Sequence, residues 1–432
     1  MSSDLAARAL TELGRAPLST PPSPPLLDGL LPARSACGGL AWSAVVAADL
    51  ASGGDGSTLD AERVAVAYRS DRYLRVDGTA PDVWSPLSGF WRTRDGWVRT
   101  HANYPHHARR LRAAFDLASS ADGSVLSSAL AGCSTADVLQ RVEREGGLAV
   151  GVRQEDPAVD AALRAAPVFD ITHSADARSS PPRVRAGASN PVQGRRVLDL
   201  TRVIAGPVAT RTLALWGADV LRIDSPELPE PEWQHLDTGH GKRSALLDVR
   251  DARIHDLLAG ADAVVLGYRP AAMRRRGLDP ETLAERYPGL VVAQLSAWGL
   301  DHPDRAGFDS LVQAESGIAM AESSDDGTPG ALPAQALDHS TGYLLAAAVA
   351  RLLARRDEEG GSWAVHTSLR RIAAELLGMP RRDAPLPRIE PDGRAHTTRF
   401  VGPGVDVTTA QAVLPRYAFS APRPFGRDAP RW

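Results

Sequence analysis

The sequence predicts a doubly wound parallel α/β sheet as its large domain, accompanied by a smaller α+β domain. Between residues 196 and 370, short apolar runs alternate with helical segments, and this alternation is typical of parallel strands joined by crossover helices. A stretch at 173–195, rich in proline, serine and arginine, has the composition of a linker. The length of 432 residues also favours more than one domain.

Five apolar runs are the expected strands of the large domain. They lie at 197–200, 220–223, 246–249, 263–266 and 290–295. Helices are expected from Pro207 onward, because proline favours the first position of a helix, and at 251–259, 279–286 and 340–355. Ligands of such sheets bind at the carboxyl ends of the strands, so the loops after the strands are the expected site.

The first half of the chain has a different pattern. A buried helix is expected at 38–51, and the segment 88–101 is typical of a β-hairpin that turns at Asp95-Gly96. Helices are expected at 105–117 and 134–145. The expected division of the chain is an N-terminal segment 1–78, a small α+β domain 79–172, a linker 173–195, a large domain 196–370 and a C-terminal tail 371–432. Within this tail, residues 385–432 are rich in proline and arginine and are expected to wrap over the chain's own or a partner's surface.

A weak internal similarity relates the first seventy or so residues to the segment 332–370. In both, Leu-Pro-Ala precedes a helix rich in alanine, and Cys37 stands where the second copy has Asp338. The N-terminal segment is either a degenerate repeat or a chance likeness between two helices of simple composition.

Composition argues against several classes of function. A hydrophobic content of 43% and a charged content of 23% are those of a soluble globular protein, and a net charge of −3 gives no reason to expect nucleic acid as a partner. No run is long enough to cross a bilayer, and the first thirty residues do not resemble a signal peptide. Two cysteines and no HExxH motif indicate no metal site. We therefore expect a cytoplasmic protein without metal or a tightly bound cofactor.

Lys242 is the only lysine among 49 basic residues. Either coding bias has replaced lysine by arginine elsewhere, or this position requires a compact ammonium group.

The first strand–helix–strand unit is Rossmann-like, and Asp224 follows its second strand where a ribose-binding carboxylate would stand. The loop 201–207 contains one glycine, Gly206, whereas the dinucleotide fingerprint needs three. The sequence therefore does not favour a nicotinamide enzyme, although a helix N-terminus remains a favourable place for a phosphate.

Seven motifs follow one another through the large domain. They are VLDLTRV with AGP (197–203, 205–207), GADVLRI (217–223), GKRS with LD (241–244, 247–248), YRP with Met273 and RGL (268–270, 276–278), AGFD (306–309), QAESG (313–317), and Asp338 with Gly342. In this order and spacing they resemble the family III CoA-transferases, which include formyl-CoA transferase, carnitine CoA-transferases and α-methylacyl-CoA racemases.

The resemblance implies a CoA-transferase acting on an acyl-CoA and a carboxylic acid, assembled as a homodimer. It implies that Asp338 attacks the thioester to give a mixed anhydride and then an aspartyl–CoA thioester. Apart from the resemblance, Asp338 is typical of a helix N-cap. The resemblance also implies that basic residues of the strand-end loops bind the phosphates of CoA, although each could equally be a solvated surface residue. They are Arg222, Lys242, Arg243, Arg269 and Arg275.

Two residues depart from the family pattern. Phe308 stands where the racemases carry a histidine, and phenylalanine cannot move a proton, so two-base epimerisation is not expected. Gly267 stands where formyl-CoA transferase has an asparagine, so the substrate is not implied. The remaining alternatives are an acyl-CoA racemase or isomerase and a non-catalytic acyl-CoA-binding protein. A polar cluster after the hairpin could line the acyl pocket, but an ordinary polar surface is the favoured interpretation. It comprises His101, Asn103, His106 and His107.

Overall fold

The large domain is built on a seven-stranded sheet with the strand order β5-β11-β10-β9-β6-β7-β8. The computed structural model describes residues 5–15, 20–174, 190–402 and 405–432, so most of the expected linker 173–195 lies outside the described residues. Six strands run parallel and β5 is antiparallel. The strands are β5 Asp170–Ser174, β6 Arg196–Leu200, β7 Asp219–Asp224, β8 Lys242–Leu246, β9 Ala263–Leu266, β10 Val291–Ser296 and β11 Ser362–Ser368.

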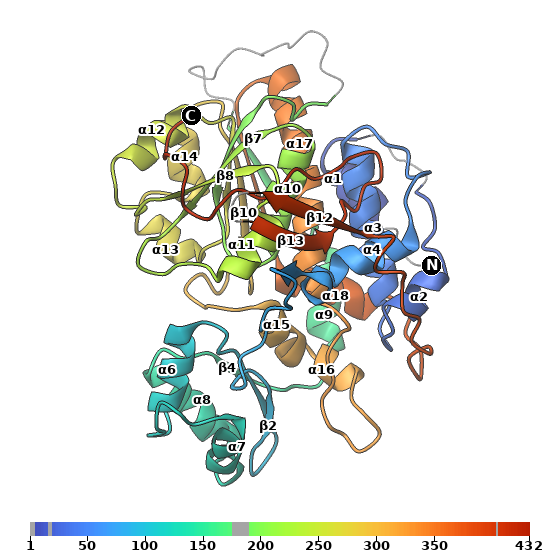
Figure 1. Cartoon of the computed structure of the whole chain (residues 1–432), viewed down its shortest axis with the longest axis vertical. Coiled ribbons are helices and arrows are strands. Elements are labelled where there is room, and N and C mark those ends of the chain that lie inside the picture. The colour runs from blue at the N-terminus through green and yellow to red at the C-terminus, as the bar shows by residue number, and fades with distance from the viewer. Residues whose placement is uncertain (1–4, 16–19, 175–189, 403–404) are drawn as a thin grey trace.

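Helices cover both faces of this sheet, which confirms the doubly wound α/β fold (Figure 1). Alternate strand residues face opposite layers, so Val197 packs in one core and Leu198 in the other. The first layer contains α10 (Ala205–Leu215) and α17 (Ala336–Glu359), and the second contains α12 (Arg253–Ala259), α13 (Pro270–Arg274) and α14 (Pro280–Arg286).

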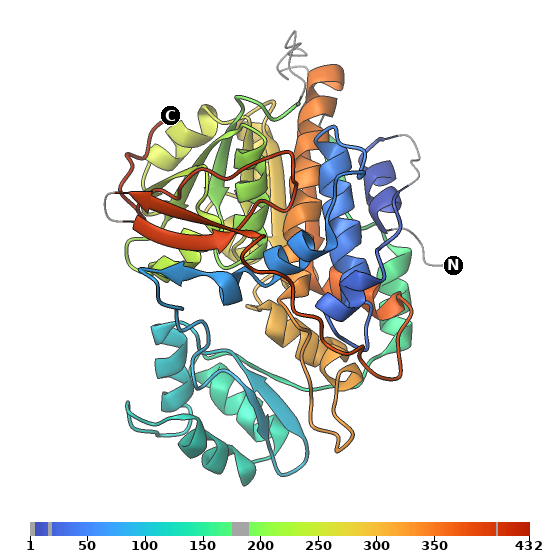
Figure 2. The same ribbon diagram turned by 45° about the vertical axis from the view of Figure 1, so that its right-hand side comes forward.

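The N-terminal segment belongs to the first of these layers. Helix α3 (Cys37–Ala51) packs along α17, and Figure 2 shows the two helices side by side. Both are buried on nearly all sides, which explains why neither sequence alternates between polar and apolar faces. The shorter helices of this segment are α1 Leu5–Glu12, α2 Leu26–Leu30, α4 Ala61–Tyr68 and α5 Ser70–Tyr73.

The small domain projects from one end of the large domain and has its own core (Figure 1). The predicted hairpin is confirmed as β2 (Phe90–Arg92) and β3 (Trp97–Thr100), and β4 (Ala149–Gly151) completes its sheet. The helices are α6 Pro105–Ala113, α7 Gly123–Ala131 and α8 Thr135–Arg144. The chain leaves this domain earlier than residue 172, because α9 (Pro157–Ala165) already packs on α18 (Leu369–Gly378).

The C-terminal tail wraps over the chain's own large domain. Strand β1 (Arg75–Val76) pairs with β13 (Val405–Ala410), which pairs with β12 (Thr397–Gly402). Farther on, the Asp428 backbone N–H donates to the carbonyl of Ser244 at 2.8 Å, and the tail covers the edge of β8. An edge strand covered in this way is shielded from pairing with another chain.

The prediction for the third strand, 246–249, was wrong in position, because β8 spans Lys242–Leu246. The predicted run is more apolar than the observed strand, which begins with a lysine. Lys242 can open this largely buried strand because its charge is paired with that of Asp199. Helix α17 also begins earlier than the expected residue 340, at Ala336. None of the described helices combines the length and the apolar character that crossing a membrane requires.

Candidate active site

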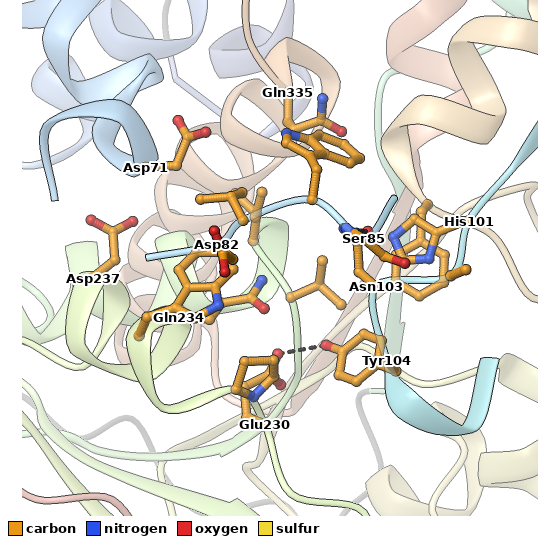
Figure 3. Close-up of a pocket in the computed structure, with 18 of the residues that line it drawn as sticks. Asp71, Asp82, Ser85, His101, Asn103, Tyr104, Glu230, Gln234, Asp237 and Gln335 are labelled. Atoms are coloured by element: carbon orange, nitrogen blue, oxygen red, sulfur yellow. Dashed lines mark hydrogen bonds between the residues drawn. The ribbon is translucent and has the colours of Figure 1, made fainter. Parts of the chain in front are cut away.

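A cavity of about 940 Å³ lies between the small domain and the carboxyl ends of β6 and β7. The small domain and the segment leading to it contribute Asp82–Pro86 and His101–His106, and the loops after β6 and β7 contribute Val203, Ile204 and Glu227–Pro231. Helix α11 (Glu232–Thr238) and the start of α17 close the cavity. Figure 3 shows the polar side chains converging on it. The cavity therefore lies at the strand ends, where the fold predicts a ligand.

Asp338 lines this cavity from the first turn of α17, with 5% of its surface exposed. It is the third residue of the helix, so the interpretation of Asp338 as an N-cap was wrong. The residue at the cap, Gln335, makes no capping hydrogen bond with its side chain. Instead Asp309, which opens α15 (Asp309–Ser316), accepts a hydrogen bond of 2.9 Å from the backbone N–H of Asp338. A carboxylate from a second helix thus caps α17.

Burial raises the affinity of both carboxyl groups for protons. Burial raises the pKa of Asp338 well above its usual value, and the charge of Asp309 raises it further. Burial raises the pKa of Asp309 to about 6, although hydrogen bonds from the Asp338 backbone and the Gln313 side chain oppose this shift. Among the described residues, no group donates a hydrogen bond to the Asp338 carboxylate. The carboxyl of Asp338 therefore faces the cavity without a fixed partner.

His101 lies directly over the ring of Phe308, which precedes Asp309. The two rings are stacked, with centroids 3.6 Å apart and planes 9° apart. Burial lowers the pKa of His101 well below its ordinary value, so its imidazole is neutral at pH 7. His101, Asn103 and His106 line the cavity, and His107 packs edge-on against Phe308. The structure therefore contradicts the favoured interpretation of this cluster as an ordinary polar surface. The β2–β3 hairpin brings this cluster into contact with Phe308 of the large domain. No local pattern in the sequence indicates this contact between distant segments.

Acidic side chains outnumber basic ones in the lining, because six of the described lining residues are acidic and Arg109 is the only arginine or lysine. The buried Glu230 accepts hydrogen bonds from the hydroxyl of Tyr104 at 2.5 Å and from Arg202 at 3.1 Å. Burial raises the pKa of Asp71 to about 6, with a further contribution from Asp237. The acidic lining residues are Asp71, Asp82, Glu227, Glu230, Asp237 and Asp338. A wall of this charge does not favour phosphate groups.

Two of the residues predicted to bind CoA are buried and paired inside the protein. Arg222 forms a bidentate pair with Asp224, with distances of 2.7 and 2.9 Å, and also contacts Glu230. The Nζ of Lys242 donates to Asp199 at 3.0 Å, to the carbonyl of Pro207 at 2.9 Å and to Thr210 Oγ1 at 2.6 Å. A compact ammonium suits this group of three acceptors, so the local packing accounts for the single lysine.

The other three predicted CoA ligands lie nearer the surface. Arg243 pairs with Asp219, which opens β7 and so lies at the strand end opposite the cavity. Arg269 and Arg275 both contact Asp304, at its carbonyl and its carboxylate respectively. None of the five predicted ligands lines the cavity, and only Arg269 and Arg275 share a partner residue. The CoA-binding role of the five stays a prediction.

Sequence reasoning did not single out Asp309, Glu230 or Tyr104. Asp309 is the last residue of the AGFD motif (306–309), and its place in that motif is the feature of the sequence that could have identified it. The buried Glu230 has no such signal, because its partners come from three separate parts of the chain.

Comparison with known proteins finds similarity mainly over the large domain. Residues 192–400 match the model of CoA-transferase family III. The chain is 30% identical over 239 residues to a probable fatty acyl-CoA transferase of Mycobacterium tuberculosis, covering 50% of this chain and 61% of that protein. It is 31% identical over 214 residues to a cinnamoyl-CoA:phenyllactate CoA-transferase of Clostridium sporogenes, covering 44% and 52%. A crystal structure of the M. tuberculosis protein, at 33% identity, covers 43% of this chain and 55% of that chain with a TM-score of 0.41. The chain spans about half the length of the curated relatives it matches.

Proposed function

We propose that this chain passes coenzyme A from an acyl-CoA to a carboxylic acid, with Asp338 as the nucleophile, because residues 192–400 match the model of CoA-transferase family III. The observation that carries the proposal is the carboxyl of Asp338. It lines the main cavity from the first turn of a long helix and has no hydrogen-bond donor among the described residues. A carboxylate without a fixed partner is available to attack a bound thioester.

The proposed reaction exchanges activated acyl groups without ATP. An oxygen of Asp338 attacks the thioester carbonyl, the carbon–sulfur bond breaks, and CoA leaves as a thiolate, giving a mixed anhydride. The thiolate attacks the aspartyl carbonyl of this anhydride, which releases the first acid and leaves an aspartyl–CoA thioester. The second acid attacks that thioester through its carboxylate, and the released thiolate then takes the new acyl group and restores Asp338. Asp338 is only 5% exposed, which limits the access of water that would hydrolyse the anhydride.

The backbone supports the negative charge that develops in these steps. The first turn of α17 presents the positive end of a 24-residue helix to the reacting atoms. Asp338 must be ionised to attack. Because the pKa of its carboxyl is raised, the ionised fraction, and with it the rate, should rise at a higher pH than for an exposed aspartate. We place the acyl group in the cavity, and we place the phosphates of CoA on Arg269 and Arg275, outside the acidic wall.

The test compares two aspartates at the same helical position. Asp137 is the third residue of α8 and is exposed on the small domain, as Asp338 is the third residue of α17. We expect Asp338→Asn to lower exchange of a labelled acid with a panel of acyl-CoAs by at least about 10³-fold, and Asp137→Asn to leave it unchanged. Hydroxylamine should trap a hydroxamate at Asp338 in the wild-type protein only. Exchange by Asp338→Asn within tenfold of wild type would refute the nucleophile.

His101 supports a second candidate, an acyl-CoA racemase. Phe308 replaces the histidine of the racemases, but the neutral imidazole of His101 lies over its ring and faces the same cavity. A neutral imidazole can take a proton from the α-carbon of an acyl-CoA. Loss of α-deuterium from a labelled acyl-CoA without an acceptor acid, abolished in His101→Gln, would favour this function. Retention of the label would leave transfer as the function.

We also propose a homodimer, as the family resemblance implies. Sedimentation equilibrium should then give twice the chain mass of 45.9 kDa. A single species of one chain would contradict this proposal.

A further inference from the structure

A second cavity, of about 320 Å³, adjoins the first. The two cavities share Asp71, Trp84 and Gln335 in their linings, so they meet near the start of α17. The second cavity lies between the β2–β3 hairpin, which contributes Arg99, and α15, which contributes Ser310. None of the proposed catalytic steps uses it.

Arg99 brings to this cavity a positive charge that has no hydrogen-bonded ion-pair partner among the described residues, although the charge of the buried Asp309 acts on it through space. Its guanidinium lies over the rings of Phe90 and Trp84, at 4.8 and 5.5 Å from their centroids. Its Nε is buried without a hydrogen-bond acceptor, and no described carboxylate forms a salt bridge with it. Burial lowers the pKa of Arg99 only to about 10, so the side chain is still charged at neutral pH. Most buried guanidinium groups are paired, because an unpaired one loses its hydration without compensation.

Ser310 supplies a second donor without a partner. It is 6% exposed, and its hydroxyl has no hydrogen-bond partner among the described residues. The neighbouring Gln313 is already occupied, because its amide donates to Asp309 and its carbonyl accepts from the Leu332 backbone at 2.9 Å. Arg99 and Ser310 therefore face one small cavity with unfilled hydrogen-bonding capacity.

We propose that this second cavity binds the non-reacting carboxylate of a dicarboxylic substrate, held by Arg99 and Ser310. The inference rests on the proposed transfer function, because it assumes that the other carboxyl of the same molecule reacts at Asp338. A planar guanidinium and a hydroxyl are donors that match a carboxylate. Gln335 lines both cavities and lies one turn before Asp338, so the proposed subsite adjoins the carboxyl that is proposed to react.

Two further charged residues border the subsite. Arg72 lines the second cavity and donates to the carbonyl of Pro333 at 2.8 Å, which adds positive charge. Asp71 faces both cavities and opposes a bound anion. Its presence predicts that Asp71→Asn binds the dicarboxylate several-fold more tightly than the wild type, because one repulsive charge is removed.

The experiment measures binding and not turnover. Glutarate and pentanoate, which have the same number of carbon atoms, are titrated calorimetrically into the full chain carrying Asp338→Asn, so that chemistry does not interfere. We expect glutarate to bind at least about tenfold more tightly than pentanoate, and Arg99→Met to remove this preference without changing pentanoate binding. Arg92→Met is the matched control, because Arg92 lies on the same hairpin but outside both cavities, and it should leave the preference unchanged.

Each other outcome has a definite meaning. Equal binding of the two acids, or an unchanged preference in Arg99→Met, would overturn the subsite. Displacement of glutarate by sulfate with no preference over pentanoate would show a site for inorganic anions instead, and this also overturns the proposal. If Arg99→Met does not fold, Ser310→Ala decides, with an expected loss of about threefold to tenfold for glutarate alone. If the wild-type chain exchanged no acid with any acyl-CoA while the Asp338→Asn chain still preferred glutarate, the proposed transfer would be refuted and the subsite would stand.

Discussion

At the scale of single residues, the site depends on two carboxyl groups that share one helix terminus. Asp309 holds the N-terminus of α17 by accepting from the Asp338 backbone, and its charge then acts on the Asp338 side chain a few atoms away. The same residue therefore helps to fix the position of Asp338, the proposed nucleophile, and raises its proton affinity. This arrangement keeps Asp338 protonated at a pH where an exposed aspartate is ionised.

The first prediction concerns the pH dependence of catalysis. Asp309→Asn keeps a side-chain oxygen that can accept from the Asp338 backbone, but it removes the negative charge that raises the pKa of Asp338. The pKa of Asp338 should therefore fall, and the rising limb of kcat/KM should move to lower pH by about one unit. Rate profiles from pH 5 to 9 measure the shift, with Asp137→Asn as the control. An unmoved limb would show that Asp309 does not control the proton.

The second prediction concerns stability. The folded state raises the pKa of Asp338 above its unfolded value of about 3.9, so ionisation costs stability as pH rises from about 4 through the folded pKa. Asp338→Asn removes this cost. The variant should be more stable than wild type at pH 8 by about 1–3 kcal/mol, and the difference should shrink toward pH 4. Urea denaturation at the two pH values measures it. An equal difference at both would contradict the raised pKa.

The sequence singled out Asp338, which lines the cavity, but not the residues around it, and the reason is physical. Asp338 could be found because an ordered set of motifs surrounds it, although its helical position was predicted wrongly. Arg99, Ser310 and His101 carry no such signal, because their roles arise where the hairpin of the small domain meets α15. Contacts between segments about 200 residues apart produce no periodic pattern in the local sequence, so they could not be predicted from it.

At the scale of elements, the packing of α10 against α17 positions the first turn of α17, which carries Asp338. Gly342 is one turn beyond Asp338, and a Cβ at this position would lie 2.6 Å from the carbonyl of Ala205 and 2.8 Å from Val208 Cβ. The close approach is possible only because the residue has no side chain. Most strands of the sheet beneath these helices could be predicted, because buried parallel strands are continuous apolar runs. The start of β8 could not, because it carries the charged residues Lys242 and Arg243.

The third prediction tests this helix contact. Gly342→Ala forces α10 and α17 apart and should lower the free energy of unfolding by about 1–3 kcal/mol, even though alanine favours the helix itself. Gly132→Ala is the control, because Gly132 follows α7 with no atom within 4 Å of its added Cβ. Chemical denaturation of both variants gives the comparison. A stabilised Gly342→Ala would show that the helices can separate without cost.

At the scale of the whole molecule, the single lysine makes global opening measurable at one site. Lys242 is fully buried at the start of β8, where the C-terminal tail covers the sheet edge, and its ammonium is held by three oxygen acceptors. Burial lowers the pKa of Lys242 to about 8, although Asp199 opposes the shift. The amine would therefore react readily with an acylating reagent at pH 8 if it could be reached.

The fourth prediction follows from this protection. In the native protein at pH 8, the peptide that carries Lys242 should be acylated at least about 100-fold more slowly than an exposed lysine, because the sheet edge must open first. Arg250→Lys supplies that exposed lysine in the same molecule, since Arg250 is 65% exposed. Mass spectrometry of the two peptides gives both rates, and urea should bring them together at the unfolding midpoint. Equal rates without denaturant would mean that the tail and β8 open independently of the core.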